Sequence, residues 1–174
     1  MDIKDVLLAE LDNWSFPVTD WELATAKEIA RLPSVIVTRP PAAQLEWMKM
    51  KPRECHTNAR WMEENDPEGR TKLIVGWWPQ NGNYVLHSIT RHRGQYVCFT
   101  PVDENLVPDS TFRFRPDPRI EKRVAEDNRW SWYRGGVKIG PGVRQDPAQT
   151  LANIKLARER LLSGMDPYEA MQLP

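Results

Sequence analysis

TKLIVGWWP (71–79), NYVLHSITR (83–91) and GQYVCFTPV (94–102) are the stretches that decide the fold. All three are rich in β-branched and aromatic residues, which favour strands. They are separated by QNGN and by a turn around RHRG, and Asn-Gly or Arg-Gly turns between such runs are typical of hairpins. The sequence therefore predicts an antiparallel meander.

The residues directly before the meander predict a helix that begins near Cys55. In RECHTNARWMEEN (53–65), Ala59, Met62 and their neighbours favour a helix, and the following DPEG ends it. The order along the chain is therefore a helix with a cysteine at its start, followed by the sheet.

The N-terminal part is predicted to be mainly helical. Apolar residues at helical spacing predict a helix at 2–13, and a second helix is capped by Thr19 or Asp20 and stops before Pro33. SVIVT predicts a short strand, whereas AAQLEWMKM is compatible with a short helix or an ordered loop.

The C-terminal part is clear only at its two ends. STFRFRP predicts a strand with Phe112 and Phe114 on one face, and residues 116–146 give no clear secondary structure. A long helix opens at Asp146 and closes at Ser163–Gly164, and DPYEAMQ predicts a last short turn.

These elements predict one α+β domain over residues 1–174. The helix with Cys55 is expected to pack on the antiparallel meander, and further helices are expected at both ends of the chain. The core motif covers 53–104, the N-terminal helical part covers 1–50, and the C-terminal extension covers 105–174.

Composition restricts the class of protein. Apolar residues make up 40% of the chain and charged residues 28%, which is typical of soluble globular proteins. The formal net charge is zero, so no global field attracts the chain to nucleic acid or membrane, and a nucleic-acid partner is not expected. A signal-like start and a long apolar run are absent from the sequence, and two cysteines do not make a disulfide scaffold. These features favour a cytoplasmic protein with reduced thiols.

Three residues have the order of a nucleophilic catalytic site: Cys55, His87 in the second strand of the meander, and Asp103 after the third. A helix N-terminus favours the reactive thiolate of a cysteine. A histidine on a neighbouring strand can accept and return the proton, and a carboxylate can orient its ring. We therefore expect a Cys–His–Asp triad that acts on an amide, peptide or isopeptide bond through an acyl-enzyme.

This order resembles the papain-like cysteine hydrolases, particularly their transglutaminase-like and NlpC-type branches. The segments ECHTNARWMEEN, LIVGWW, VLHSIT and YVCFTPVDEN are also similar to uncharacterised bacterial and phage proteins of that broad type. The resemblance covers residues 53–104 and implies a papain-like core with Cys55 as nucleophile, His87 as general base and acid, and Asp103 as orienter. It also implies a peptide or other amide-containing substrate and no cofactor. Gln44 is the nearby candidate for the glutamine that such peptidases use to bind the oxyanion.

Four further residues are candidates for substrate binding or support. His56 points about 100° around the helix from Cys55 and is expected to line the groove. Asn58 is placed to bond locally or to a substrate carbonyl. Trp77 and Trp78 face opposite sides of the sheet, so one is expected in the core and the other, taken as Trp77, in a groove. Gln44 completes this set.

The second cysteine leaves two alternatives open. With RHRG as a four-residue loop, Thr90 faces Gln95 and His87 faces Cys98. Cys98 would then lie near the proposed site, either to form a disulfide with Cys55 or to complete a zinc site with Cys55, His56 and His87. A packed, inert strand cysteine is the simpler interpretation of Cys98.

A non-catalytic function also remains open. The segment 111–144 holds nine basic and four acidic residues, and it contains Trp130, Trp132 and Tyr133 among arginines. Such a segment can bind an anionic partner, although a solvated face with aromatic anchors explains it equally. The alternative is a binding or structural module, phage-associated or toxin-related, on the same scaffold.

Overall fold

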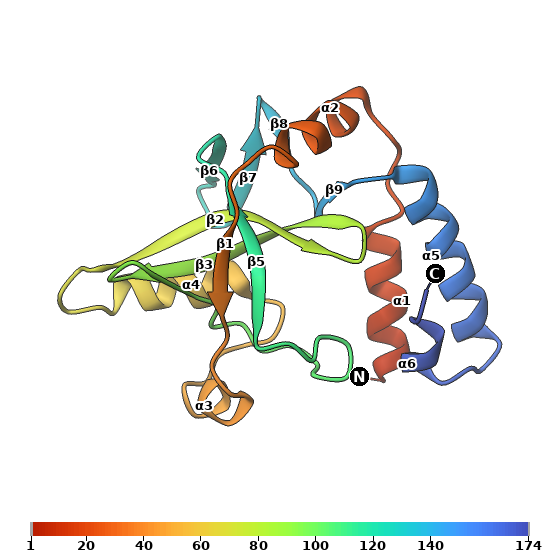
Figure 1. The fold of residues 1–174 in the computed structure, drawn as a ribbon, viewed down its shortest axis with the longest axis horizontal. Coiled ribbons are helices and arrows are strands. Elements are labelled where there is room, and N and C mark those ends of the chain that lie inside the picture. The colour runs from red at the N-terminus through yellow and green to blue at the C-terminus, as the bar shows by residue number, and fades with distance from the viewer. Residues whose placement is uncertain (1, 174) are drawn as a thin grey trace.

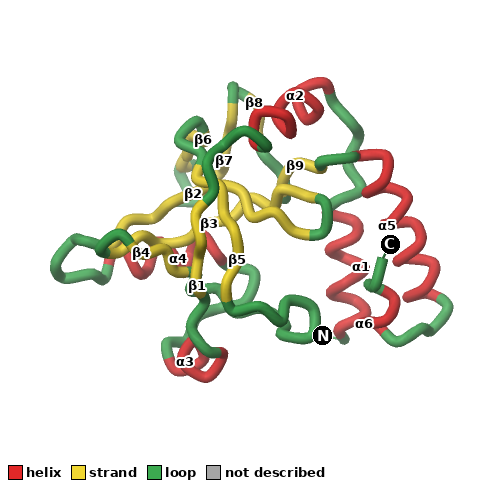
Figure 2. Tube along the Cα trace, in the orientation of Figure 1, coloured by secondary structure: helices red, strands yellow, loops and turns green. Residues whose placement is uncertain are grey.

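The computed structural model describes residues 2–173 and has an α+β architecture with helices at both ends (Figures 1 and 2). The helices are α1 (Ile3–Asn13), α2 (Asp20–Ile29), α3 (Ala42–Trp47), α4 (Cys55–Glu64), α5 (Pro147–Leu162) and α6 (Pro167–Ala170). The strands are β1 (Val35–Thr38), β2 (Thr71–Gln80), β3 (Asn83–His92), β4 (Gln95–Val97), β5 (Thr111–Pro116), β6 (Ile120–Val124), β7 (Trp130–Arg134), β8 (Val137–Lys138) and β9 (Gly142–Arg144). The predicted meander corresponds to β2, β3 and β4, and the helix before it is α4.

The main sheet closes on itself. Its strands pair in the order β2-β5-β1-β4-β3, and β3 also pairs with β2 along its whole length, so the five strands form a small barrel. All contacts in the ring are antiparallel except the one between β1 and β4, where Thr38 lies opposite Val97. Strand β9 joins the outer edge of β3 at residues 83–85.

The hairpin between β3 and β4 is tighter than the sequence predicted. Thr90 lies opposite Val97 rather than Gln95, so the predicted register was wrong by two residues. The reason is that Arg93 and Gly94 form a two-residue turn, with left-handed φ values of 50° and 82°. This geometry is that of the turns that fit the twist of antiparallel strands.

One apolar cluster fills the barrel. Its fully buried members include Val37 of β1, Ile89 of β3, Phe114 of β5 and Cys98 beyond β4. Alternation along β3 places Val85 in the same cluster. Val85 and Ile89 of β3 therefore face the interior of the barrel.

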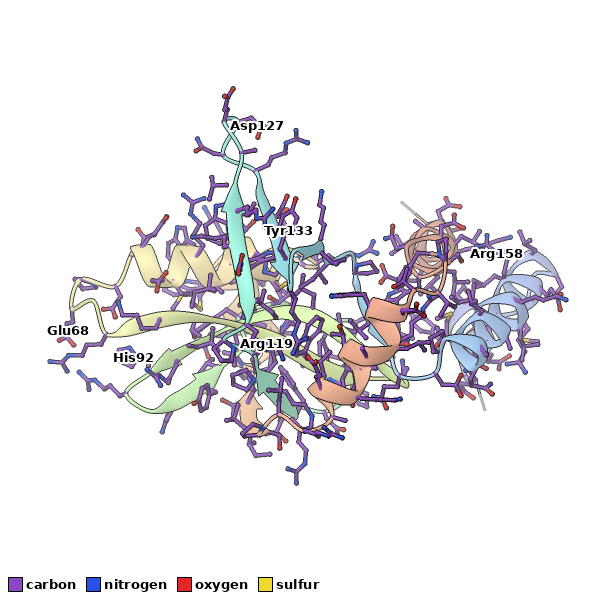
Figure 3. The ribbon with its side chains drawn as sticks, turned by 90° about the horizontal axis from the view of Figure 1, so that it is seen from above. Glu68, His92, Arg119, Asp127, Tyr133 and Arg158 are labelled. Atoms are coloured by element: carbon purple, nitrogen blue, oxygen red, sulfur yellow. The ribbon has the colours of Figure 1, made fainter. Side chains whose placement is uncertain are left out.

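A second cluster covers the outside of the barrel. Trp77 of β2 and Leu86 of β3 face outward and pack with Ile29 of α2 and Trp132 of β7. Helix α4 lies against β2 and β3 on this outer face, and β1 and β5 lie on the opposite side of the two strands (Figures 1 and 3). One face of the β2–β3 pair therefore packs against α4, and the other faces the interior of the barrel.

Residues 116–146, which gave no clear pattern, contain the second sheet, β6-β7-β8, and strand β9. Arg134 of β7 is only 2% exposed and bonds Asp117 and Glu28, so this sheet is tied to α2 and to the end of β5. The tip of its β6–β7 hairpin, at Asp127, projects away from the barrel (Figure 3).

Three of the helices, at the two ends of the chain, form a separate layer. Helices α1, α5 and α6 pack together through Leu7, Leu11, Ile154 and Leu161. Among residues 2–173, no helix is long and apolar enough to cross a membrane.

Candidate functional site

Cys55 is the first residue of α4, and the loop before it is held in place by Asn58. The backbone N–H of Lys51 donates to Asn58 Oδ1 at 3.1 Å, and Asn58 Nδ2 donates to the Lys51 carbonyl at 2.8 Å. The same loop contains Arg53, with a left-handed φ of 65°. The N-cap residue Glu54 provides no side-chain cap to the first N–H groups of the helix. Asn58 therefore fixes the helix start rather than reaching outward.

The Cys55 thiol lies beside a gap in the edge of β3. On that edge β9 covers residues 83–85, β4 covers 90–92, and the Leu86 N–H donates to Pro141. The N–H of Ser88 points toward the Cys55 sulfur. Burial raises the pKa of Cys55 to about 11, although the N–H groups of Ser88, His56 and Cys55 itself act in the opposite direction. In this conformation Cys55 is a neutral thiol.

His87 and Cys98 form a direct pair inside the barrel. His87 Nε2 lies 3.2 Å from Cys98 Sγ, and both side chains are buried. Burial lowers the pKa of His87 to about 3, and burial also raises the pKa of Cys98. The pair is therefore a neutral imidazole and a neutral thiol, joined by one hydrogen bond.

A buried cation, Arg39, lies next to this pair. Its Nη2 is 3.9 Å from Cys98 Sγ, and its Nε donates to the Thr100 carbonyl at 3.2 Å. The guanidinium carbon lies 5.2 Å from the Trp78 ring centre and 4.9 Å from that of Phe112. Among residues 2–173, no carboxylate lies within ion-pair distance of Arg39. Aromatic faces and carbonyls stabilise this charge instead.

His56 is held on the outer face of β3. Its Nδ1 lies 2.6 Å from Ser88 Oγ, and its ring centre is 4.9 Å from that of Trp132. Burial lowers the pKa of His56 to about 4. These contacts connect α4 to the second sheet, and they orient the helix that begins with Cys55.

Asp103 does not reach His87. Its Oδ2 accepts a hydrogen bond from Tyr168 at 2.9 Å, and its Oδ1 accepts one from the Asn105 N–H at 2.9 Å, a contact that lowers the pKa of Asp103. The chain leaves β3 after Val97, because the Cys98 N–H donates to the Thr38 carbonyl of β1. Asp103 is carried away with it and anchors α6. The residue that contacts the His87 ring is Cys98, not the predicted Asp103.

Two of the predicted binding residues are placed elsewhere. Trp77 was expected to line a groove, but it is fully buried, and its Nε1 donates to Asp117 Oδ2 at 2.8 Å. The outward face of β2 is covered by α2 and the second sheet, which the sequence did not reveal. Gln44 lies on α3 with an exposed side chain, and no hydrogen bond within residues 2–173 connects that side chain to the thiols.

The two cysteines are free thiols, and no disulfide joins them. Within the described part of the chain, no group of three or more His, Cys, Asp or Glu side chains has an arrangement that could hold a metal ion. The zinc alternative therefore has no geometric support.

A cleft of about 420 Å³ runs between α4 and β4. Trp61 and Met62 line its helix side, and Val97 and Phe99 line its strand side. Asn65 and Asp66, after the end of α4, line it as well. The cleft therefore runs along the second half of α4, and neither Cys55, His87 nor Cys98 lines it.

Comparison with known proteins adds no further identification. The chain matches no protein-family model, no curated protein and no solved structure.

Sequence reasoning missed two members of this site. Arg39 follows a short strand in RPP and belongs to no motif, so only the closure of the barrel brings it to Cys98. Ser88 lies in the predicted second strand of the meander, but its contacts with Cys55 and His56 depend on where α4 docks. The proximity of Cys98 to His87 was found from strand pairing, although the register used for it was wrong.

Proposed function

We propose that the protein is a cysteine-dependent hydrolase or acyl transferase that acts on an amide, peptide or isopeptide bond. Cys55 is the nucleophile, His87 is the general base and acid, and Cys98 replaces Asp103 as the residue that orients His87. The observation that supports this assignment best is the 3.2 Å contact between His87 Nε2 and Cys98 Sγ. With Nε2 engaged, Nδ1 is the ring nitrogen left to exchange a proton with Cys55.

The reaction starts from neutral partners. The Cys55 sulfur attacks the carbonyl carbon of the substrate while its proton passes to His87 Nδ1, since burial disfavours a preformed thiolate–imidazolium pair. This step requires Nδ1 and the sulfur to approach hydrogen-bond distance when substrate binds, and catalytic hydrogen bonds often tighten in this way. The N–H groups at the start of α4 donate hydrogen bonds to the carbonyl oxygen as negative charge develops on it.

In the second half of the reaction, His87 gives up the proton that it accepted from Cys55. As the carbon–nitrogen bond breaks, the amine leaves with the proton from His87, and Cys55 is left as a thioester. Water or a second amine then attacks the thioester, gives its proton to His87, and releases the Cys55 thiol, which regains that proton. Hydrolysis and transfer thus differ only in the second nucleophile.

The proposal is tested with a peptide-like chloroacetamide and intact-protein mass measurement. We expect one adduct on Cys55, formed at least tenfold faster in the wild-type protein than in His87→Gln, because general-base assistance is lost. Cys98→Ser serves as the matched control and should keep the adduct on Cys55. Equal rates in wild-type protein and a folded His87→Gln variant would show that His87 does not activate Cys55.

The raised pKa of Cys55 favours a second candidate, a non-catalytic binding module with inert thiols. Burial that raises the pKa of a thiol is typical of structural cysteines. In this case both thiols react slowly with the chloroacetamide, at rates that simply follow their exposure, and Cys55→Ala leaves partner binding unchanged.

A further inference from the structure

A basic pocket lies beside the turn between β3 and β4, on the face of these strands opposite to α4. It has a volume of about 510 Å³ and is lined by Arg70, Lys72, Arg91, Arg93 and Tyr96 together with two glycines. Because the whole chain has a formal net charge of zero, four cations around one pocket are a local concentration of charge.

Strand register brings two of these cations directly together. Lys72 is paired with Arg91 across β2 and β3, and Arg91 is paired with Tyr96 across β3 and β4. Like charges directly opposite in an antiparallel sheet destabilise it. Neither Lys72 nor Arg91 forms an ion pair with any of the described residues. A neutral residue at either position would remove this repulsion, yet both positions hold a cation.

The turn beside the pocket shows the same preference for a cation. Both tight hairpins have the same backbone geometry, with φ of 50° and 75° at Asn81–Gly82 and of 50° and 82° at Arg93–Gly94. Asparagine is the favoured non-glycine residue in this left-handed position, and arginine is not. The first hairpin follows the rule, whereas the second places an arginine at the rim of the pocket.

Among residues 2–173, Glu68 is the one carboxylate within ion-pair distance of these cations. Glu68 lies 3.2 Å from Arg70 and 3.1 Å from Arg93, and both arginines remain more than half exposed. Figure 3 shows Glu68 at the same end of the molecule as His92, the last residue of β3. The cations are therefore free to contact a ligand.

We propose that this pocket binds a nucleoside diphosphate. Arginine guanidinium groups bind phosphate oxygens through two parallel hydrogen bonds, and several convergent cations match a ligand with more than one negative charge. Tyr96 provides an aromatic surface beside them on which a base can stack. The volume is that of a small-molecule site, not of a duplex groove. This site is independent of the thiol chemistry proposed for Cys55.

Calorimetric titration of the full chain with ADP, inorganic pyrophosphate and an eight-nucleotide oligothymidylate tests the proposal. We expect ADP to bind at 50 mM NaCl, pyrophosphate to bind at least threefold more weakly because it lacks a base, and both affinities to fall at 300 mM NaCl. Lys72→Gln/Arg91→Gln should weaken ADP binding at least tenfold. The matched control, Lys27→Gln/Lys155→Gln, removes two exposed lysines of α2 and α5 and should change affinity by less than twofold.

Three results would overturn the proposal. They are the absence of ADP binding at 50 mM NaCl, equal ADP affinity in the pocket variant and the wild-type protein, and binding of the oligonucleotide without binding of ADP or pyrophosphate. Equal affinities for ADP and pyrophosphate would also overturn it, because the nucleoside would then contribute nothing to binding.

Discussion

At the scale of single residues, the contact between His87 and Cys98 is the feature with the clearest chemical consequence. Sulfur is a weak hydrogen-bond acceptor, so Cys98 orients the imidazole less firmly than a carboxylate does. Arg39, 3.9 Å from the same sulfur, offers a counter-charge to any anion placed there. Position 98 is therefore suited to an acidic side chain, although the chain has a cysteine there.

We predict that Cys98→Asp speeds the reaction of Cys55 with the chloroacetamide by about tenfold, because a carboxylate orients His87 and stabilises its protonated form. Cys98→Ala should slow the reaction. The double variant Cys98→Asp/Arg39→Met is the control, since its buried carboxylate lacks the cation. A rate that does not change in any of these variants would separate Cys98 from the chemistry of Cys55.

The buried His87 and the half-buried His56 predict a loss of stability in mild acid. Their pKa values are lowered from 6.5 to about 4 in His56 and about 3 in His87, both by burial. Below pH 6.5 the unfolded chain therefore binds protons that the folded protein does not, and the free energy of unfolding decreases as the pH falls toward these values. Urea unfolding at pH 7.0 and pH 5.0 measures the effect. His56→Gln should lose less stability over this interval, and a variant with the full loss would contradict the assignment.

At the scale of elements, the sequence predicted those parts whose pattern is local. Alternating β-branched residues gave β2, β3 and β4, and Thr19 and Asp146 gave correct helix starts, because caps and periodicity depend on neighbouring residues. The turn around RHRG was predicted, but its register was wrong, because an arginine is unusual in a two-residue turn and a four-residue loop was expected. Strands β6 to β9 were not predicted, because they are short and depend on contacts with distant residues, such as the bond between Arg134 and Glu28.

Gly76 lies where β2 pairs with β5, and a substitution at this position is expected to be strongly destabilising. A Cβ at this position would lie 2.2 Å from the carbonyl oxygen of Arg115, which is backbone and cannot move aside. We expect Gly76→Ala to lower the free energy of unfolding by about 3 kcal/mol. Gly140→Ala is the matched control, because nothing lies within 4 Å of its Cβ, and it should be nearly neutral in the same urea titration.

At the scale of the whole molecule, a buried ion pair connects the N-terminal helices to the sheet. Arg144 of β9 is fully buried and bonds both carboxylate oxygens of Glu22 in α2, at 2.8 and 3.0 Å. Its Nη1 also donates to the carbonyls of Trp14 and Phe16, in the segment that joins α1 to α2. One guanidinium thus fixes the path of the first helices against the edge of the barrel.

Removing one partner of this pair should be costly. Glu22→Gln leaves a buried guanidinium without its counter-charge, and we expect a loss of about 3 kcal/mol or more in the free energy of unfolding. The double variant Glu22→Leu/Arg144→Met should recover much of that loss, because both charges are then absent. A double variant as unstable as Glu22→Gln would show that packing, not charge, dominates at this position.

The parallel contact of β1 with β4 also determines how the chain reaches this structure. The hairpins of β2, β3 and β4 form from neighbouring residues, whereas the side-chain bond from Thr38 to Tyr96 spans 58 residues. Long-range parallel pairing is slow, because the entropy of closing the loop is lost before the contacts form. Docking of β1 is therefore expected as the last step of folding, and it is the step that seals Cys98 inside. Pulse labelling of Cys98 with a thiol reagent during refolding would then report the time at which the barrel closes.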